Sequence, residues 1–266
     1  MTYQLVAVDL DGTLIGPDLQ VQPRDREAIG RARAAGVRIT IATGRGFPVT
    51  QEYARDLGLA TPVICYQGGL VKDPATGEVL YEATLPSEAY AEAVQLAQEQ
   101  DLDFHVYAGN IAYLTELRRS RAFYDRWFSL PFRQVHDLVT ELDHPPVKFL
   151  ITADEDEADQ IEKVWKAHFD GRLQIVRSHP LFVEGTSLGV SKGNALAHLA
   201  EHLGIAQEAV IAIGDNDNDR SMIQWAGLGV VVGNAPDSLK ADADYVAPVQ
   251  SEAAVAHVIQ RFILGS

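Results

Sequence analysis

The sequence lacks the residues and segments that several classes of protein require. It has a single cysteine, Cys65, so it can form no internal disulfide and no cysteine cluster that binds zinc. No uninterrupted apolar run approaches the roughly 18 residues of a membrane-spanning helix. The first residues also lack the basic and then apolar pattern of an export signal. We therefore expect a cytoplasmic protein that is neither exported nor embedded in a membrane.

Positive charge is also scarce. The 266 residues include 22 Lys and Arg against 37 Asp and Glu, which gives a formal net charge of -15. A surface of this sign repels nucleic-acid phosphates, so we expect no DNA or RNA partner. An anionic substrate would need a local cation to hold it. The hydrophobic fraction of 47% is enough to fill the core of one large domain or two ordinary ones.

Short apolar runs alternate with helical patterns at both ends of the chain. Strands are expected at residues 3–8, 37–42, 63–66, 209–213 and 228–232. Helices are expected at residues 24–35, at 192–203 after a capping Ser191, and at 219–226. This alternation is typical of a parallel sheet covered by helices.

The middle of the chain has a different pattern. Helices are predicted at residues 87–100, 117–128 and 155–168, and strands at 103–107, 111–114, 147–152, 172–177 and 181–184. This segment is long enough to fold alone. The predicted fold class is α/β, with a parallel-sheet core formed by residues 1–82 and 189–266 and a smaller α/β domain inserted at 83–188.

The predicted core strands end in polar or glycine-rich segments. These are residues 9–13 (DLDGT), 43–46 (TGRG), 67–69 (QGG) and 214–219 (GDNDND). Ligands of open parallel sheets bind beyond the carboxyl ends of the strands, so we expect the segments to converge. Asp9 and Asp11 would share one face of an extended strand, and Asp215 would add a third carboxylate. Such an oxygen-rich site favours Mg²⁺, which would offset the repulsion between the carboxylates.

A metal ion would let this acidic chain bind a phosphate. Lys192, Thr43 and glycine backbone N–H groups would complete the cradle. Asp9 and Asp11 would then take different roles, one attacking phosphorus and the other protonating the leaving oxygen.

Four motifs resemble, in order and spacing, those of the haloacid dehalogenase superfamily of phosphatases. They are residues 9–14 (DLDGTL), 43–45 (TGR), 190–193 (VSKG) and 214–219 (GDNDND) followed by Ser221 and Met222. The chain is most similar to the Cof-type subfamily, which has a Rossmann-like core and a cap inserted between the second and third motifs. It departs from that pattern at residues 67–69, where Gln-Gly-Gly replaces the usual Asn-Gly-Ala.

The resemblance implies a role for each matched residue. Asp9 would be the nucleophile that forms an aspartyl-phosphate, and Asp11 the general acid and then base. Asp219 would support the metal site or orient Lys192. The implied Mg²⁺ ligands are Asp9, Asp11 through its carbonyl, Asp215 and Asp219. The implied phosphate or substrate contacts are Leu10 and Gly44 through their backbone, Thr43, Arg45, Lys192 and Asn218.

The predicted function is Mg²⁺-dependent hydrolysis of phosphate monoesters of small metabolites, with sugar phosphates as the expected class. Specificity would come from the cap, around His105, Tyr107, Arg118 and Glu184. Two alternatives stay open. A phosphomutase or phosphotransferase would use the same core, and a non-enzymatic phosphate-accepting module would combine similar acidic, Thr and Lys residues.

Two rival motifs are weaker. Residues 185–189 (GTSLG) match the elbow of serine hydrolases, for which Asp215 and His257 would complete a triad. Ser187 lies four residues before the helix cap, however, whereas an elbow turns directly into its helix. Residues 198–202 (HLAEH) match a zinc-peptidase pattern but are better explained as the solvent face of a helix.

Overall fold

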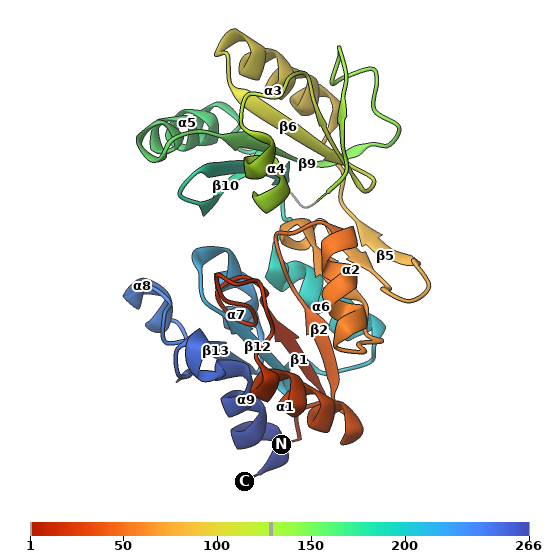
Figure 1. Cartoon of the computed structure of the whole chain (residues 1–266), viewed down its shortest axis with the longest axis vertical. Coiled ribbons are helices and arrows are strands. Elements are labelled where there is room, and N and C mark those ends of the chain that lie inside the picture. Colours follow the sequence, from red (N-terminus) through yellow and green to blue (C-terminus); the bar gives the residue numbers. More distant parts are fainter. Residues whose placement is uncertain (1, 128–129, 266) are drawn as a thin grey trace. The chain divides into compact units, whose positions relative to one another are not determined.

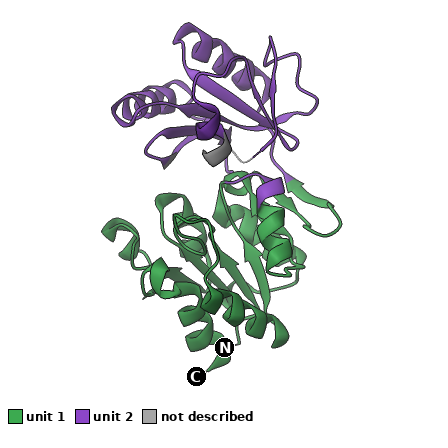
Figure 2. Cartoon of the chain, in the orientation of Figure 1, with its two compact units in different colours: residues 1–44, 50–81, 191–266 green, residues 45–49, 82–190 purple. Residues whose placement is uncertain are grey.

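A computed structural model describes residues 2–127 and 130–265 (Figure 1). The chain forms two compact units (Figure 2). The first comprises residues 1–44, 50–81 and 191–266, and the second comprises residues 45–49 and 82–190. Within the described residues, none of the helices combines the length and apolar character that crossing a membrane requires.

The first unit contains a five-stranded parallel sheet in the order β14-β13-β12-β1-β2. The strands are β1 (Leu5–Val8), β2 (Arg38–Ile41), β12 (Val210–Gly214), β13 (Leu228–Val231) and β14 (Tyr245–Val246). Strand β1 is wholly buried and pairs with β2 on one side and β12 on the other. This explains its continuous apolar sequence, since a parallel strand is covered on both faces.

Helices pack around this sheet. They are α1 (Pro23–Ala34), α2 (Phe47–Asp56), α6 (Lys192–His202), α7 (Arg220–Trp225), α8 (Asp237–Lys240) and α9 (Ala254–Ile259). Leu196 and Leu199 of α6 join Leu5 and Ala7 of β1 in one core cluster, as the spacing of the leucines predicts. Short 3₁₀ turns lie at η1 (Tyr66–Gly68), η2 (Gln207–Ala209), η3 (Asp217–Asp219) and η4 (Gln250–Glu252), and a π-helical turn, η5 (Gln260–Leu264), follows α9.

The third predicted strand differs from expectation. Residues 63–66 are expected to extend the parallel sheet, but β3 (Val63–Cys65) joins the end of β2 through an isolated parallel bridge between Ala42 and Ile64. It instead begins an antiparallel sheet with β4 (Leu70–Lys72) and β5 (Val79–Glu82). The left-handed backbone at Tyr66 and Gln67 ends the strand after three residues.

The second unit contains a six-stranded sheet in the order β10-β11-β9-β6-β7-β8. Its strands are β6 (Asp103–Ala108), β7 (Ile111–Leu114), β8 (Phe132–Gln134), β9 (Pro146–Thr152), β10 (Leu173–His179) and β11 (Phe182–Ser187). Its helices are α3 (Ser87–Glu99), α4 (Arg121–Trp127) and α5 (Glu155–His168). Phe149 and Trp165 lie at the centre of its apolar core. The predicted α/β class, a parallel core sheet with an inserted smaller α/β domain, is confirmed.

Two details of the second unit differ from the prediction. The helix expected over residues 117–128 begins at Arg121, because Ser120 Oγ accepts a hydrogen bond from the Phe123 N–H and caps it. The last residue of that prediction, Phe128, lies outside the described residues. Strand β8 has no apolar alternation and was not predicted.

Candidate active site

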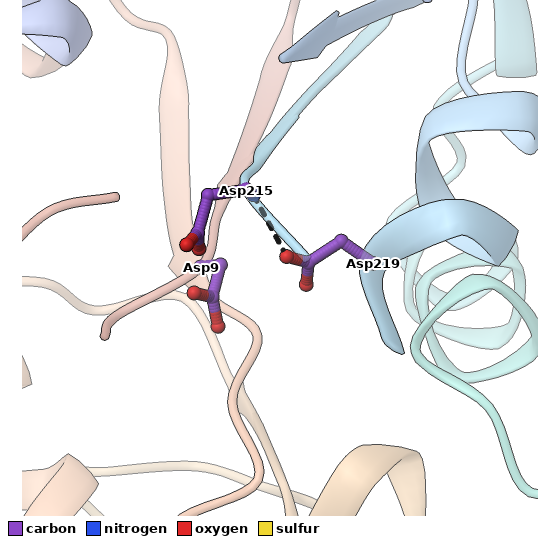
Figure 3. Close-up of side chains that lie close together, drawn as sticks. All are labelled: Asp9, Asp215 and Asp219. Carbon is purple, nitrogen blue, oxygen red and sulfur yellow. Dashed lines mark hydrogen bonds between the residues drawn. The ribbon is translucent and has the colours of Figure 1, made fainter. Parts of the chain in front are cut away.

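Three aspartates meet at the carboxyl edge of the parallel sheet (Figure 3). Asp9 follows β1, while Asp215 and Asp219 follow the neighbouring strand β12. One carboxylate oxygen of each lies within 4.8 Å of the others. Strand pairing thus brings together side chains that are far apart in the sequence, and it concentrates negative charge where Asp9 and Asp219 are buried.

Lys192 supplies the positive charge closest to this cluster. It is the first residue of α6, whose cap Ser191 accepts a hydrogen bond from the Asn194 N–H at 3.1 Å. The side chain is fully buried, and Nζ donates to Asp9 Oδ1 at 2.5 Å and to Asp219 Oδ1 at 2.6 Å. Lys192 therefore holds one oxygen of Asp9 in a fixed position.

Burial and mutual repulsion shape the acid–base properties of the cluster. Burial alone would lower the pKa of Lys192, but Asp219 and Asp9 outweigh it and raise that pKa, so the ammonium stays charged. Burial and the Asp219 carboxylate raise the pKa of Asp9 well above its ordinary value, although Lys192 opposes them. The same two causes raise the pKa of Asp215 to about 6. Because its carboxylates repel one another, such a site favours the binding of an added cation.

Asp219 organises the loop that carries Asp215. Its Oδ2 accepts from the backbone N–H groups of Asp215 at 2.9 Å and Asn216 at 3.1 Å, while its Oδ1 accepts from Lys192. A Cβ at Gly214 would lie 2.5 Å from the Asp219 Cβ, so only glycine lets this carboxylate fold back. Asp219 thus contacts both Lys192 and the loop that carries Asp215.

Asp11 lies in a different environment from Asp9. β1 ends at Val8, and Leu14 and Ile15 donate to the Leu10 carbonyl, so residues 10–15 form a turn. Asp11 therefore does not continue an extended strand as expected, whereas the expectation that both carboxylates face one pocket stays a prediction. Asp9 is buried within the cluster, whereas the Asp11 side chain is exposed.

Thr13 is a site residue that sequence reasoning did not single out. Its Oγ1 donates to Asp215 Oδ1 at 3.0 Å, and its side chain is fully buried. Gly12, just before it, has a φ of +83°, and a Cβ there would lie 2.3 Å from Asp215 Oδ2. The Gly-Thr pair of the first motif was the available signal.

The segments predicted to bind phosphate meet near the end of β2. Thr43 is buried, and its N–H donates to the Ile64 carbonyl at 2.9 Å. A Cβ at Gly44 would lie 2.5 Å from Gln67 Nε2, and Asn218 Nδ2 donates to Gln67 Oε1 at 3.0 Å. Arg45 belongs to the second unit, unlike Thr43 and Gly44. Its predicted contact with substrate stays a prediction.

One face of the six-stranded sheet is polar, and we call it the polar face. Its polar residues, which alternate with core residues along β6, β9 and β11, are Asp103, His105, Tyr107, Lys148, Thr152, Glu184 and Thr186. All are buried. Lys148 Nζ lies 2.7 Å from Glu184 Oε2 and 4.8 Å from the centroid of the Tyr107 ring.

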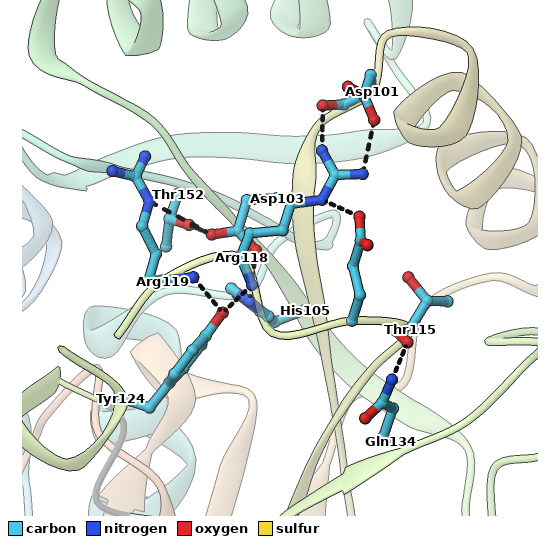
Figure 4. A network of polar contacts seen from close by, with 10 residues as sticks. Asp101, Asp103, His105, Thr115, Arg118, Arg119, Tyr124, Gln134 and Thr152 are labelled. Carbon is cyan, nitrogen blue, oxygen red and sulfur yellow. Dashed lines mark hydrogen bonds and ion pairs between the residues drawn. The ribbon is translucent and has the colours of Figure 1, made fainter. Parts of the chain in front are cut away.

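The predicted specificity residues divide between two places. His105, Tyr107 and Glu184 lie on the polar face, where His105 Nε2 is 2.9 Å from Asp103 Oδ1. Arg118 is instead occupied by ion pairs with Asp101 at 2.6 Å and Glu116 at 2.5 Å (Figure 4).

The rival motifs have structural roles. Ser187 is the last residue of strand β11 and does not stand in a sharp turn into a helix. His257 pairs with the Tyr245 hydroxyl at 2.8 Å. His198 stacks on Tyr81 with ring centroids 5.1 Å apart.

Comparison with known proteins places the chain in a family. The family described as haloacid dehalogenase-like hydrolase matches residues 6–259. The chain belongs to this family. The protein YxeH of Bacillus subtilis is 33% identical over 273 residues, which cover 98% of this chain and 99% of YxeH. The 5-amino-6-(5-phospho-D-ribitylamino)uracil phosphatase YcsE of the same organism is 30% identical over 263 residues. The match covers 98% of this chain and 96% of YcsE.

The fold of this hydrolase is shared over nearly its whole length. A haloacid dehalogenase-like hydrolase from Bacteroides thetaiotaomicron has a TM-score of 0.88 and 30% identity, with 98% of this chain and 99% of that chain covered. The family and the enzyme class predicted from the motifs, a Cof-type phosphatase, are confirmed.

Proposed function

We propose that this phosphatase hydrolyses phosphate monoesters of small metabolites, with sugar phosphates and related polyol phosphates as its substrates, through a phosphoryl group carried on Asp9. The observation that carries the proposal is the buried Asp9–Lys192 pair beside Asp215 and Asp219. Because Lys192 holds Oδ1, the other oxygen of Asp9 is oriented as a nucleophile.

Two steps follow from this arrangement. In the first, an Asp9 oxygen bonds to phosphorus while the bond to the ester oxygen breaks, and the Asp11 carboxylic acid protonates that oxygen. In the second, Asp11 takes a proton from water and the water oxygen attacks phosphorus. The bond between phosphorus and the Asp9 oxygen breaks, which releases inorganic phosphate and restores the Asp9 carboxylate. The exposed Asp11 suits proton exchange better than the buried Asp9 does.

The carboxylate cluster fits Mg²⁺, because three carboxylates converge and the pKa values of Asp9 and Asp215 are raised. We assign Asp9, Asp215 and the Asp11 carbonyl as ligands. Asp219 supports them, since Lys192 and two N–H groups engage both of its oxygens. When bound, Mg²⁺ would neutralise charge on the phosphoryl oxygens.

We assign the remaining contacts to two groups. Thr43, Lys192 and Asn218, with backbone at Leu10 and Gly44, would hold the phosphoryl group. Residues 83–188 would be the substrate-specificity domain, inserted between core segments 1–82 and 189–266, and Arg45 would help bind substrate.

The polar face supports the choice of substrate class. Lys148, Glu184 and His105 offer charged and polar groups that suit the hydroxyls of a polyol. The relative YcsE is named for a substrate whose phosphate sits on a ribityl chain, which is itself a polyol.

The test is phosphate release from a panel of phosphoesters, with and without chelator. We expect Mg²⁺-dependent release, fastest from sugar phosphates, and a loss of about a thousandfold or more in Asp9→Asn. An isomeric phosphoester as product would indicate a mutase, and stable phosphorylation without turnover would indicate a phosphate-accepting module. Either result would overturn the proposal.

A further inference from the structure

The loop between β3 and β4 has an unusual backbone. Tyr66 (φ +52°), Gln67 (φ +61°) and Gly68 (φ +100°) are consecutive and all left-handed. Left-handed residues other than glycine are uncommon, and here two stand side by side. A strained backbone of this kind persists only where the surroundings enforce it, and such places cluster at binding sites.

This loop touches three of the four segments to which phosphate contacts are assigned, those that carry Thr43, Lys192 and Asn218. The Gln67 N–H donates to the Thr43 carbonyl at 3.1 Å. A Cβ at Gly68 would lie 2.2 Å from the Ser191 carbonyl oxygen, so the loop lies directly against the residue before Lys192. Gln67 Oε1 accepts from Asn218 Nδ2 at 3.0 Å. All of these contacts are within the first unit.

The Gln67 side chain fills the space between two of these segments. It is buried, and its Nε2 lies so close to Gly44 that a Cβ there would be 2.5 Å away. Its Oε1 engages one of the two N–H bonds of the Asn218 amide. Half-buried Asn218 is thereby held in one orientation.

We propose that Gln67 is a positioning residue for the phosphate site. The strained loop holds its amide against Gly44, and that amide orients Asn218 so that the second Asn218 N–H is presented to a phosphoryl oxygen. Gln67 itself does not contact the phosphate. The inference rests on the proposed function, because it requires Asn218 to bind the phosphoryl group.

The test compares the affinity of the full-length chain for inorganic phosphate, measured by calorimetry with Mg²⁺ present. Gln67→Met keeps the length of the side chain but removes the acceptor, and we expect about tenfold weaker phosphate binding and a matching rise in KM. Asn218→Ala should weaken binding to a similar degree. The double variant should bind phosphate about as tightly as whichever single variant binds it less tightly, because the two residues act as one unit.

Two further variants separate positioning from folding. Gln67→Gly adopts a positive φ without strain and should therefore fold, yet it should bind phosphate as weakly as Gln67→Met. Gln51→Met is the matched control, because Gln51 of the same unit donates to the Pro74 carbonyl and is assigned no contact with the phosphate site. It should leave phosphate affinity unchanged.

The outcomes are distinct. If Gln67→Met and Gln67→Gly bind phosphate within twofold of wild type, or if the effects of Gln67→Met and Asn218→Ala multiply in the double variant, the positioning role is wrong and the proposed function stands. If wild type neither binds phosphate nor hydrolyses any ester, both fail.

Discussion

At the scale of single residues, Gly12 determines how closely the first motif approaches Asp215. Gly12→Ala would place a Cβ 2.3 Å from Asp215 Oδ2, at a φ of +83°. We expect it to cost about 1 kcal/mol in the free energy of unfolding and to raise the Mg²⁺ concentration needed for half-maximal phosphate release by about tenfold.

Gly36→Ala is the control for the backbone alone. Gly36 has a φ of +87°, but a Cβ there would meet nothing within 4 Å. It should lose similar stability, measured by urea denaturation, and keep its Mg²⁺ dependence. Equal Mg²⁺ dependence in the two variants would mean that Gly12 does not position Asp215.

The sequence predicted the acidic residues of the site better than their surroundings. Asp215 could be named because it follows a strand end, and Lys192 because it begins a helix after the cap Ser191; both places are readable from apolar runs and motifs. The sequence could not show that Asp9 is buried and Asp11 exposed, because this difference depends on the turn after Val8. The same holds for Gln67, whose contacts depend on its backbone dihedrals.

At the scale of elements, Asp25 links α1 to α9. Its Oδ1 accepts from the Ala256 N–H at 2.7 Å, whereas Oδ2 has no hydrogen-bond partner among the described residues. Burial raises the pKa of Asp25 from 3.8 to about 6, although the Ala256 hydrogen bond opposes the change. The carboxyl therefore stabilises the fold when protonated, and this contribution is lost as the pH rises through about 6.

Asp25→Asn removes this titration and keeps the acceptor for Ala256. Relative to the variant, wild type should lose about 1 kcal/mol of unfolding free energy between roughly pH 5 and 7.5, measured by urea denaturation. The titration of the active-site aspartates cancels in this difference. A constant difference across that range would contradict the assigned pKa shift.

Short elements were the hardest to predict. β3 and β8 are three residues each, and what they pair with depends on neighbours distant in the sequence. Long periodic elements such as α5 and β9 were predicted nearly to their ends, because the apolar face that they bury is visible in the sequence.

At the scale of the whole molecule, the parallel sheet is assembled from both ends of the chain. The alternation of strands and helices predicted this arrangement because the same pattern appears on both sides of a middle segment. The pairing of Lys148 with Glu184 was not predicted. Lys148 belongs to the polar face because of the register of β9 with β6 and β11, which the sequence alone does not specify.

This buried pair provides a test of the proposal that residues 83–188 determine substrate specificity. In a Lys148→Met/Glu184→Gln double variant no buried charge is left unpaired, so the fold should hold, whereas Lys148→Met alone should destabilise it by about 3 kcal/mol. In the double variant we expect kcat/KM for sugar phosphates to fall by about tenfold. Acetyl phosphate, which carries no polyol, should be hydrolysed within about twofold of the wild-type rate. An equal fall in the rates for sugar phosphates and for acetyl phosphate would mean that the Lys148–Glu184 pair does not determine specificity.

The proposed mechanism depends most on Asp9 as the carrier of the phosphoryl group. The most direct measurement is to quench the reaction of a substrate with a labelled phosphate in acid and to locate the label on the protein by mass spectrometry. We predict an acid-stable, hydroxylamine-labile label on Asp9 in wild type and none in Asp9→Asn, which should also release no phosphate above background. Phosphate release by wild type without any label on Asp9, or full Mg²⁺-dependent release by Asp9→Asn, would contradict the account.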